Sequence, residues 1–329
     1  MADDPEKELA EREALTVARV VLGLADVVRQ LRSDYLSLDS DAARRTTLGL
    51  AVTKRWVARS SAYQHTVSLL DVGLGRVARL VGDSVVQLRT HATQAGAAQA
   101  ASLAESLGGD GSQLSEARVA AMVAELDRGP LDAILTRHAR ETSAAAGQVL
   151  LESVATRRDV RSTAKLLGQV LDVPRWQALS IARTEQYRAY REAQRQTWLA
   201  DEGVTGWTWV ANLDRRTCGF CWSQHGLEFL LEEKPAAHVS CRCRMVPVTA
   251  RTRGRRTGEQ RFAELSEAAQ NAVLGPAAAE AYRDGLFTLA DVAGHIEHPH
   301  WGRTGRVRSL RELLGDDVRA TYLAAVRNR

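Results

Sequence analysis

Apolar residues in the first third of the chain recur every three or four positions, which places them on one face of a helix. A first series runs from 17 to 35, and a second from 52 to 88 repeats about every 3.5 residues. Residues 39–41, Asp-Ser-Asp, offer N-cap side chains, so a second helix is expected to begin there. No proline interrupts 6–129, which permits long helices. The first series predicts a buried seam of Val17, Val21, Leu24, Val28, Leu31 and Tyr35.

The helical pattern is broken at three places further along. Residues 108–112, Gly-Gly-Asp-Gly-Ser, are expected to form a loop before a helix at about 113–127. Gly129 and Pro130 then separate this helix from another that ends near 156. Asp172-Val173-Pro174 is expected to open the next helix, because proline is tolerated in a first turn. These breaks predict antiparallel helices packed as a bundle or coiled coil.

After Gly203 the period of the pattern changes from helix to strand. Segments 207–210, 226–230 and 245–248 are expected to pair as a small, largely antiparallel sheet that rests on the preceding helix. Residues 251–256 resemble a basic linker, and helices are expected at 260–274, 277–286 and about 307–326.

The predicted fold class is therefore mostly α with a small α+β module. The expected organisation is a helical bundle or coiled-coil-like domain at 1–156, the α+β module at 157–250, and a basic linker with a helical C-terminal tail at 251–329.

Composition agrees with a folded protein of 329 residues, since 45% are hydrophobic and 26% are charged. The N-terminus lacks the basic start and apolar core of a signal peptide. No apolar run approaches the roughly 18 residues of a membrane span. We therefore expect no membrane partner and a protein that is made and stays in a cytosol. In that compartment clustered cysteines are typical of metal sites more than of disulfides.

The sharpest chemical signal is a cluster of cysteines and one histidine. Cys218 and Cys221 form a Cys-x-x-Cys pair, and after sixteen residues His238, Cys241 and Cys243 follow. Two such ligand pairs from separate turns can complete a tetrahedron around zinc. The preferred ligands are Cys218, Cys221, His238 and Cys241, with Cys243 as the alternate. Four soft and imidazole ligands leave no open position, so the expected zinc is structural.

Other interpretations of the cluster stay open. The cysteines can be independent buried thiols, can form disulfides outside the cell, or can hold an open catalytic metal. A thiol nucleophile with His238 as base and Asp214 as its orienting group has the right residue types for a protease. Neighbouring thiolates at ligand spacing compete for that histidine.

The cluster belongs to a longer ordered motif. Ala-Arg-Thr-Glu at 182–185 precedes Gly-Trp-Thr-Trp at 206–209, Asp-Arg-Arg-Thr-Cys-x-x-Cys at 214–221 and His-x-x-Cys-Arg-Cys at 238–243. Over roughly 150–250 this order resembles the Mu F-like head-morphogenesis family of phage minor capsid proteins, which makes 157–250 a Mu F-like module.

The resemblance implies a structural protein of the virion and no enzymatic activity. It implies a few-copy component that is built into the procapsid beside the portal protein, inside the head near the portal vertex, after synthesis in the host cytoplasm. It further implies a role in procapsid assembly, with DNA packaging or delivery as an additional role. Scaffold or major capsid protein are the other expected partners. The rival functions are a capsid maturation protease, another Cys/His hydrolase, and a zinc-dependent DNA-binding regulator.

Several polar residues outside the cluster have expected roles. Arg183 and Glu185 are two apart on a helix and face different sides, so one of them is expected to bond to the loop at 214–217, which begins with Asp214. The histidines at 295, 298 and 300 are expected in a solvated turn. Sequence-independent DNA contact is a second interpretation of the linker arginines, which otherwise face solvent. They are Arg251, Arg253, Arg255 and Arg256.

Overall fold

We analysed a computed structural model of the protein, which describes residues 5–125, 129–316 and 320. The chain divides into two compact units, one made of 1–89 with 126–186 and the other of 90–125 with 187–329. Each unit is built from two stretches of chain because helices α3 (Ser61–Ser106) and α6 (Val160–Leu199) contribute to both. The three-part division expected from the sequence stays a prediction.

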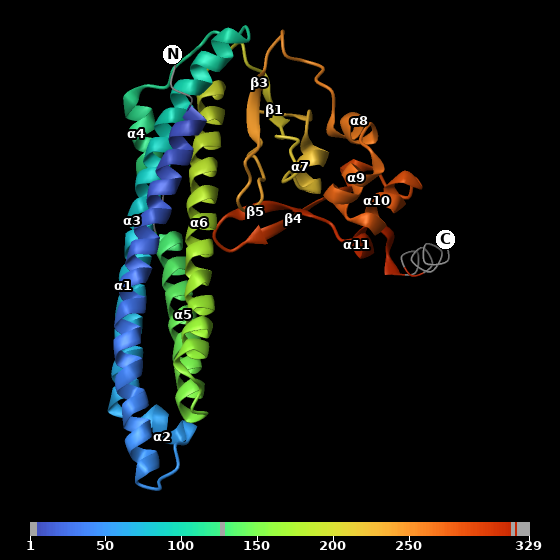
Figure 1. Ribbon diagram of the computed structural model, residues 1–329. Coiled ribbons are helices and arrows are strands. Elements are labelled where there is room, and N and C mark those ends of the chain that lie inside the picture. Colours follow the sequence, from blue (N-terminus) through green and yellow to red (C-terminus); the bar gives the residue numbers. More distant parts are fainter. Residues whose placement is uncertain (1–4, 126–128, 317–319, 321–329) are drawn as a thin grey trace. The chain divides into compact units, whose positions relative to one another are not determined.

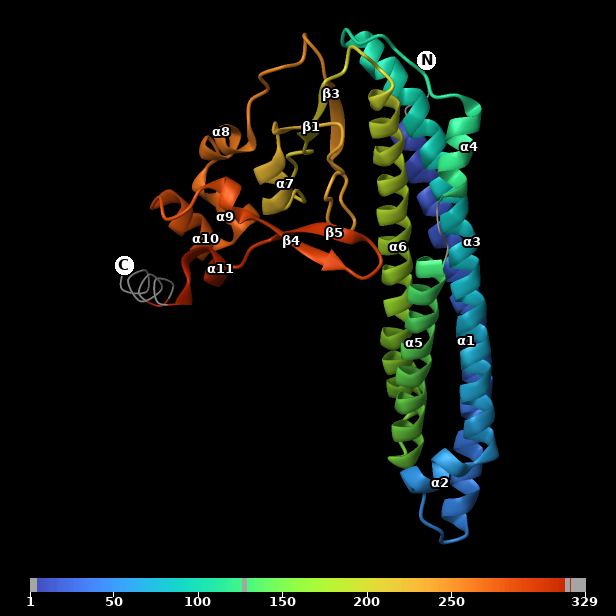
Figure 2. The same cartoon turned by 180° about the vertical axis from the view of Figure 1, so that it is seen from behind.

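The first unit is a bundle of long helices. Helices α1 (Pro5–Thr47), α3, α5 (Gly129–Ala155) and α6 run alongside one another, with the short α2 (Lys54–Arg59) at one end (Figures 1 and 2). The buried seam of α3 follows the predicted spacing. Its members include Leu70, Leu74, Val77, Val81 and Leu88.

The seam of α1 differs from the expected one by one position. Leu24, Leu31 and Tyr35 are buried as predicted, but Val21 and Val28 are 41% and 45% exposed. Their neighbours are buried in their place, namely Val20 and Val27. Adjacent valines fit a helical period equally well, so only packing decides which one of each pair faces inward.

Two expected helix starts were wrong. Helix α1 continues through 39–41 to Thr47, because Leu38 and Ala42 extend its buried seam across the polar triplet. Helix α6 passes through 172–174 and begins at Val160, where Asp159 accepts a hydrogen bond from the Ser162 amide at 2.9 Å. N-cap chemistry thus lies at Asp159 and not at 172.

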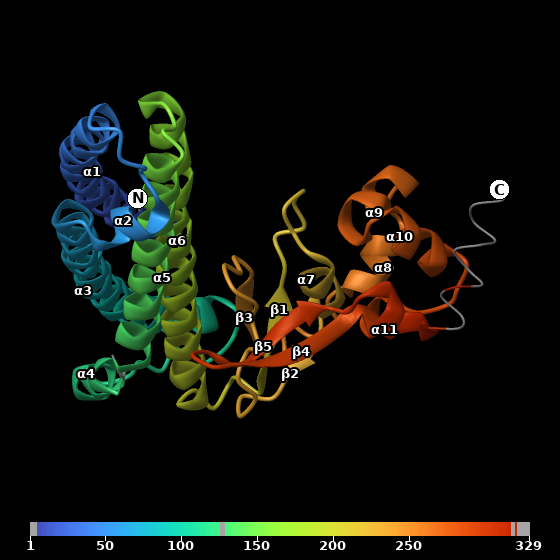
Figure 3. The same ribbon diagram turned by 90° about the horizontal axis from the view of Figure 1, so that it is seen from below.

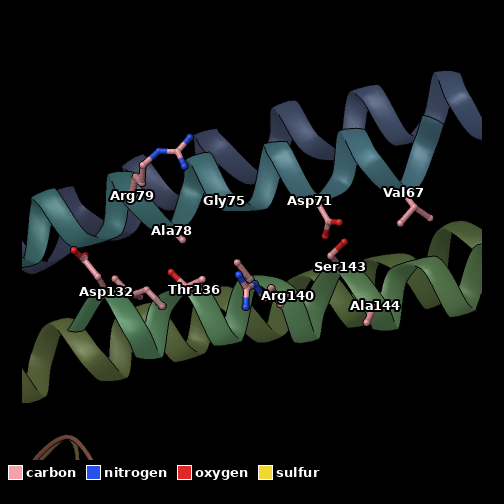
Figure 4. Close-up of a pocket in the computed structure, with 12 residues that line it drawn as sticks. Val67, Asp71, Gly75, Ala78, Arg79, Asp132, Thr136, Arg140, Ser143 and Ala144 are labelled. Carbon is pink, nitrogen blue, oxygen red and sulfur yellow. The ribbon is translucent and has the colours of Figure 1, made fainter. Parts of the chain in front are cut away.

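A groove of about 780 Å³ lies between α3 and α5 in the bundle (Figure 4). Small side chains such as those of Gly75, Ala78 and Ala144 line it and leave the space unfilled. Acids and bases surround these small residues in equal number, so the groove favours neither an anionic nor a cationic ligand. They are Asp71, Asp132, Arg79 and Arg140.

The second unit contains the predicted sheet. Strands β1 (Gly206–Val210), β2 (Glu228–Phe229) and β3 (Arg244–Val248) pair in the order β2-β1-β3, with both pairings antiparallel. Trp207 lies opposite Phe229 on one side and Pro247 on the other. The buried Trp198 of α6 packs in the same core and donates its indole N–H to the Ala100 carbonyl of α3 at 3.1 Å. The sheet therefore rests on the preceding helix, as expected.

Further elements of this unit flank the sheet. The break at 108–112 is confirmed, and α4 (Glu116–Ala124) follows it. Beyond β3 the expected helix at 260–274 is two helices, because Ser266 caps a second start. The helices of this region are α8 (Gly258–Ala263), α9 (Glu267–Leu274), α10 (Pro276–Arg283), the 3-10 turn η1 (Leu289–Val292) and α11 (Leu310–Leu314).

A second, two-stranded sheet was not predicted. Strands β4 (Ala293–His298) and β5 (Gly302–Val307) form an antiparallel hairpin (Figure 3). His295 and His298 therefore lie on a strand and not in the expected solvated turn, whereas His300 lies in the turn between the strands. The hairpin also corrects the start of the helix expected at 307. Residues 317–319 and 321–326 of that helix lie outside the described residues. Glycine, histidine and arginine dominate both strands, so the alternation that marks a strand is weak there.

Candidate metal centre

The first ligand pair lies where the chain leaves β1 and enters α7 (Gly219–Gln224). Cys218 is the N-cap residue of this helix, and its carbonyl accepts a hydrogen bond from the Trp222 amide at 3.0 Å. Cys221 follows within the first turn, so both sulfurs lie at the same end of α7. Before the helix, Asp214 accepts a hydrogen bond from the Thr217 hydroxyl at 3.0 Å and closes the loop.

The second ligand pair comes from the turn that precedes β3. The Cys241 amide donates to the His238 carbonyl at 3.2 Å, which closes the turn. Ser240 adopts a left-handed conformation with φ 60°, a region that residues other than glycine rarely enter. This conformation reverses the chain tightly enough to bring His238 and Cys241 to the side of α7.

All five candidate side chains gather at one place. His238 Nε2 lies 3.2 Å from Cys218 Sγ and 3.1 Å from Cys221 Sγ, and Cys221 Sγ lies 3.7 Å from Cys241 Sγ. Two ligand groups result, one of Cys218, Cys221 and His238 and one of Cys221, Cys241 and Cys243. Within each group the ligand atoms lie within 4.8 Å of one another. The two groups share Cys221, which makes it the centre of the cluster.

One edge of the cluster has the length expected for a tetrahedral zinc ion, although the four preferred ligands are divided between the two groups of three. With zinc–sulfur bonds of about 2.3 Å, neighbouring sulfurs of a tetrahedron lie about 3.8 Å apart. The distance of 3.7 Å between Cys221 and Cys241 matches that edge. Apart from half-buried Cys218, the sulfurs are buried in the core of the module, where an ion would be shielded from water. Residues of this kind can hold zinc, and the choice between Cys241 and Cys243 as fourth ligand stays a prediction.

The ring of His238 is oriented for metal binding. Its Nδ1 lies 2.7 Å from the Val239 carbonyl oxygen, which can only accept a hydrogen bond. Nδ1 therefore carries the proton and donates it to this carbonyl, and Nε2 faces the sulfurs. A hydrogen bond of this kind on the far nitrogen is the usual way in which proteins fix a ligating histidine.

The electrostatics of the cluster favour the thiolate form at two of its four cysteines, Cys218 and Cys241. Hydrogen bonds from Cys221 and His238, which together outweigh burial, lower the pKa of Cys218 to about 4. The hydrogen bonds from Cys221 and Cys243 hold the pKa of Cys241 well below its usual range. Hydrogen bonds from the neighbouring sulfurs, with that of Cys218 the largest, raise the pKa of Cys221. The hydrogen bond from Cys221 lowers the pKa of Cys243, but the one from Cys241 and burial outweigh it and raise this pKa. Burial acts to lower the pKa of His238, but the sulfurs of Cys218 and Cys241 raise it to about 10. Negative charge is thus favoured on the sulfurs of Cys218 and Cys241, and the thiolate is the form that binds a metal cation.

Arg191 of α6 binds the backbone carbonyls of the segment that carries Cys241 and Cys243. Its guanidinium is buried and donates to the Cys241 carbonyl at 2.9 Å and to the Cys243 carbonyl at 2.7 and 3.0 Å. One turn later Arg195 donates to the Leu231 carbonyl at 2.5 Å. Buried carbonyls in this irregular segment need such partners because no strand pairs with them. Their signal in the sequence is weak, namely two arginines four residues apart on the helix before the sheet.

The residues of the Ala-Arg-Thr-Glu motif have other partners than expected. Arg183 forms an ion pair with Glu13 of α1, with Nε 3.1 Å from the carboxylate, so the expected bond to the 214–217 loop was wrong for this residue. Glu185 forms a buried ion pair with Arg89 of α3 at 3.3 Å. The loop itself is bound by Arg242, whose guanidinium lies 2.9 Å from Asp214.

The unexpected hairpin braces the ligand loop. The ring of Phe220, between the two ligands of α7, packs edge-on against the rings of His238 and of His295 on β4. On β5, the Gly305 amide donates to the Ala236 carbonyl at 2.8 Å, two residues before His238. A side chain at 305 would meet the Phe220 ring at 2.2 Å, so only glycine fits there. The hairpin therefore supports both ligand pairs.

The linker arginines are solvent-exposed, as either interpretation of them requires. Arg251 also donates to the Ser106 carbonyl at 3.4 Å, and Arg256 forms an ion pair with Glu264. Contact with DNA stays a prediction. Within the described part of the chain, no helix has the length and apolar character needed to cross a membrane.

Comparison with known families bears directly on this module. Residues 147–246 match the family described as Phage Mu protein F like protein. The resemblance found in the sequence is confirmed over this segment, which contains α6, β1, β2, the first three residues of β3 and all five candidate ligands. No curated protein and no solved structure matches the chain.

The family match indicates a protein of phage head morphogenesis. This family is structural and is not a known enzyme family, so the match points to a component of the virion that interacts with other capsid proteins.

Proposed function

We propose that this protein is a minor capsid protein that associates with the portal and assists procapsid assembly by docking, without catalytic turnover. The observation that carries the proposal is the Phage Mu protein F like match over 147–246, which coincides with the cluster of candidate ligands. A role in DNA packaging or delivery belongs to the same proposal, with a position inside the head near the portal vertex.

In this proposal a structural zinc joins the two ligand turns. Cys218, Cys221, His238 and Cys241 would hold it, and the bound ion would supply a cross-link between α7 and the turn before β3. Arg191 binds the carbonyls of the ligand segment, and Phe220 packs between the ligands and the hairpin. The result would be a rigid surface on a sheet of three short strands, with the ion adding to the stability that the sheet gains by packing on α6.

The arrangement supports a structural centre over a hydrolase. A nucleophilic thiol needs one base and access to a substrate. Here one imidazole nitrogen contacts two sulfurs at nearly equal distances, and Cys221, Cys241 and Cys243 are buried. Such shared contacts suit ligands around one ion.

Co-expression with the portal, scaffold and major capsid proteins of the same phage tests the proposal. We expect the protein in procapsids that contain portal and its absence from particles assembled without portal. On the basis of its long apolar seams we further propose residues 1–150 as the region that contacts portal or scaffold, and their removal should abolish incorporation. Equal incorporation into portal-free particles would contradict the association. Cleavage of the major capsid protein that depends on the half-buried Cys218 in a folded, metal-free protein would favour the protease instead.

A further inference from the structure

Helix α1 is apolar on two opposite faces. One face forms the buried seam of the bundle, and the other points away from it and still carries large aliphatic side chains. Leu15 and Leu22, seven residues apart, are 62% and 68% exposed. The remaining exposed members are Val21, Val28 and Leu36. Aliphatic residues repeated at helical spacing on an outer face are typical of a surface that contacts another protein.

A groove runs beside this apolar face, between α1 and α3. It encloses about 350 Å³ and is floored by glycine from each helix, Gly23 and Gly73. A methyl group at these positions would lie 3.1 Å from Val77 and 3.0 Å from Val27, so the two helices approach closely there. Exposed aliphatic side chains of α3 line the outer wall of the groove, namely Val72 and Leu80. A ridge of leucines on α1 thus lies next to an apolar groove.

Charges along the groove side of α1 are ordered by sign. Arg12 and Arg19 occupy its first half, and Asp26 and Asp34 occupy its second half, at steps of seven or eight residues. The local ion pairs of Arg12 with Glu8 and of Asp26 with Arg29 are exposed and contribute little. Between residues 12 and 34, α1 therefore presents a basic half and an acidic half to the side of the groove.

In the acidic half, only one of the two carboxylate oxygens of Asp34 has a hydrogen-bond partner among the described residues. One carboxylate oxygen accepts a hydrogen bond from Gln30 at 3.0 Å. The other, Oδ2, is buried at the groove and has no hydrogen-bond partner among the described residues. A carboxylate oxygen in that state favours a cation brought by a docking molecule. The groove also has a base on its α3 wall, Arg76, so its lining is acidic by one charge on the two walls together.

We infer that α1 and the groove form a two-fold interface with a second copy of this chain, docked with its α1 antiparallel. The register places residue i of one copy opposite residue 45 − i of the other. Leu22 then lies over Gly23, Arg19 lies opposite Asp26, and Arg12 comes within one residue of Asp34.

The order of charges along α1 favours a second copy of this chain as the partner that binds the groove. In a two-fold dimer each contact occurs twice, so a helix with a basic half and an acidic half satisfies itself when it runs antiparallel. The ridge of one copy fills the groove of the other in the same arrangement. This interface is additional to the proposed portal association.

Charge reversal tests the register on the full-length protein. Arg12→Asp with Arg19→Asp gives an all-acidic α1 side, and Asp26→Arg with Asp34→Arg gives an all-basic one. Each double variant should dimerise at least about tenfold more weakly than the wild type by analytical ultracentrifugation, because like charges then face each other. Mixing the two should restore a heterodimer, and the quadruple variant should dimerise with itself again. Circular dichroism checks that each variant is folded.

Cross-linking tests the centre of the interface. Leu22→Cys should give a disulfide-linked dimer on mild oxidation. Leu36→Cys is the matched control, being similarly exposed and in the same background of native cysteines. In the antiparallel register its two copies lie about 40 Å apart, from a rise of about 1.5 Å per residue, and should stay unlinked.

The inference is overturned if the wild type stays monomeric at high concentration, if the mixed charge variants do not associate, or if Leu36→Cys links as well as Leu22→Cys. Portal protein that binds this face of a monomer and is released by the Arg12 and Arg19 changes would also overturn it. Failure of these dimer tests leaves the proposed portal association standing, because incorporation into procapsids is measured in a separate experiment.

Discussion

The α+β module and the helical bundle reach stability by opposite means. In the module, two ligand turns, a buried arginine and a hairpin converge on one cluster between 218 and 243. In the bundle, burial is spread along seams in α1 and α3, with each leucine or valine contributing its own share. A single change in the module should therefore act on the whole module, whereas a single change in the bundle should act in proportion to the atoms removed.

Loss of a central ligand should have the largest effect. Cys221→Ser removes the sulfur common to both ligand groups, so zinc should be absent and the module should unfold. Structural zinc contributes an apparent binding free energy of roughly 10–16 kcal/mol in small finger peptides. Metal analysis and thermal unfolding measure both effects. Cys243→Ser is the control, since it retains one zinc per chain if Cys241 is the fourth ligand.

A broken ion pair should be the most severe single change in the bundle. Arg89→Met leaves Glu185 charged and buried, and we expect unfolding to become easier by about 3–5 kcal/mol in urea denaturation. The double change Arg89→Met with Glu185→Leu removes both charges and should recover most of that loss. If the double variant is as unstable as the single one, the unpaired buried charge of Glu185 is not the cause of the lost stability.

A methyl group at the hairpin should have a smaller effect. Gly305→Ala places a carbon 2.2 Å from the Phe220 ring, and the strain should lower the free energy of unfolding by about 1–3 kcal/mol and weaken zinc binding. The matched change in α6, Gly168→Ala, meets nothing within 4 Å and should stabilise its helix by about 0.5–1 kcal/mol. Equal effects at both positions would remove the contrast between the two regions.

The smallest effect is expected in the loop at 214–217, which precedes α7. Burial opposes ionisation of Asp214, but hydrogen bonds from Arg242 and Thr217 outweigh it and lower its pKa. Its stabilising effect is therefore present above the unfolded pKa of about 3.9 and is lost as the pH falls through the lower folded pKa. Asp214→Asn should reduce the free energy of unfolding by less than about 1 kcal/mol at pH 7. The stabilities of the two proteins should converge as the pH falls through the lowered pKa of Asp214, which chemical denaturation at several pH values can measure.

Local motifs could be predicted from the sequence because their chemistry is local. The Cys-x-x-Cys and His-x-x-Cys spacings brought all five candidate ligands to notice, and alternating tryptophans located β1. Helix ends were less predictable. Polar residues at 39–41 resemble a cap, but buried neighbours carry α1 through them.

Contacts between distant segments could not be predicted. Nothing in the sequence near Arg191 reveals that its guanidinium binds carbonyls fifty residues later. The hairpin of β4 and β5 carries few β-branched residues, so its role beside Phe220 becomes visible only through packing. The faces of α1 show the same limit, since adjacent valines fit either register until the bundle is assembled.

Zinc-edge X-ray absorption on the purified full-length protein tests the central claim most directly. We expect one zinc per chain, with three sulfur neighbours at about 2.3 Å and one nitrogen at about 2.0 Å. A folded protein that contains no metal, or a zinc bound mainly by oxygen, would contradict a structural centre formed by these cysteines and His238.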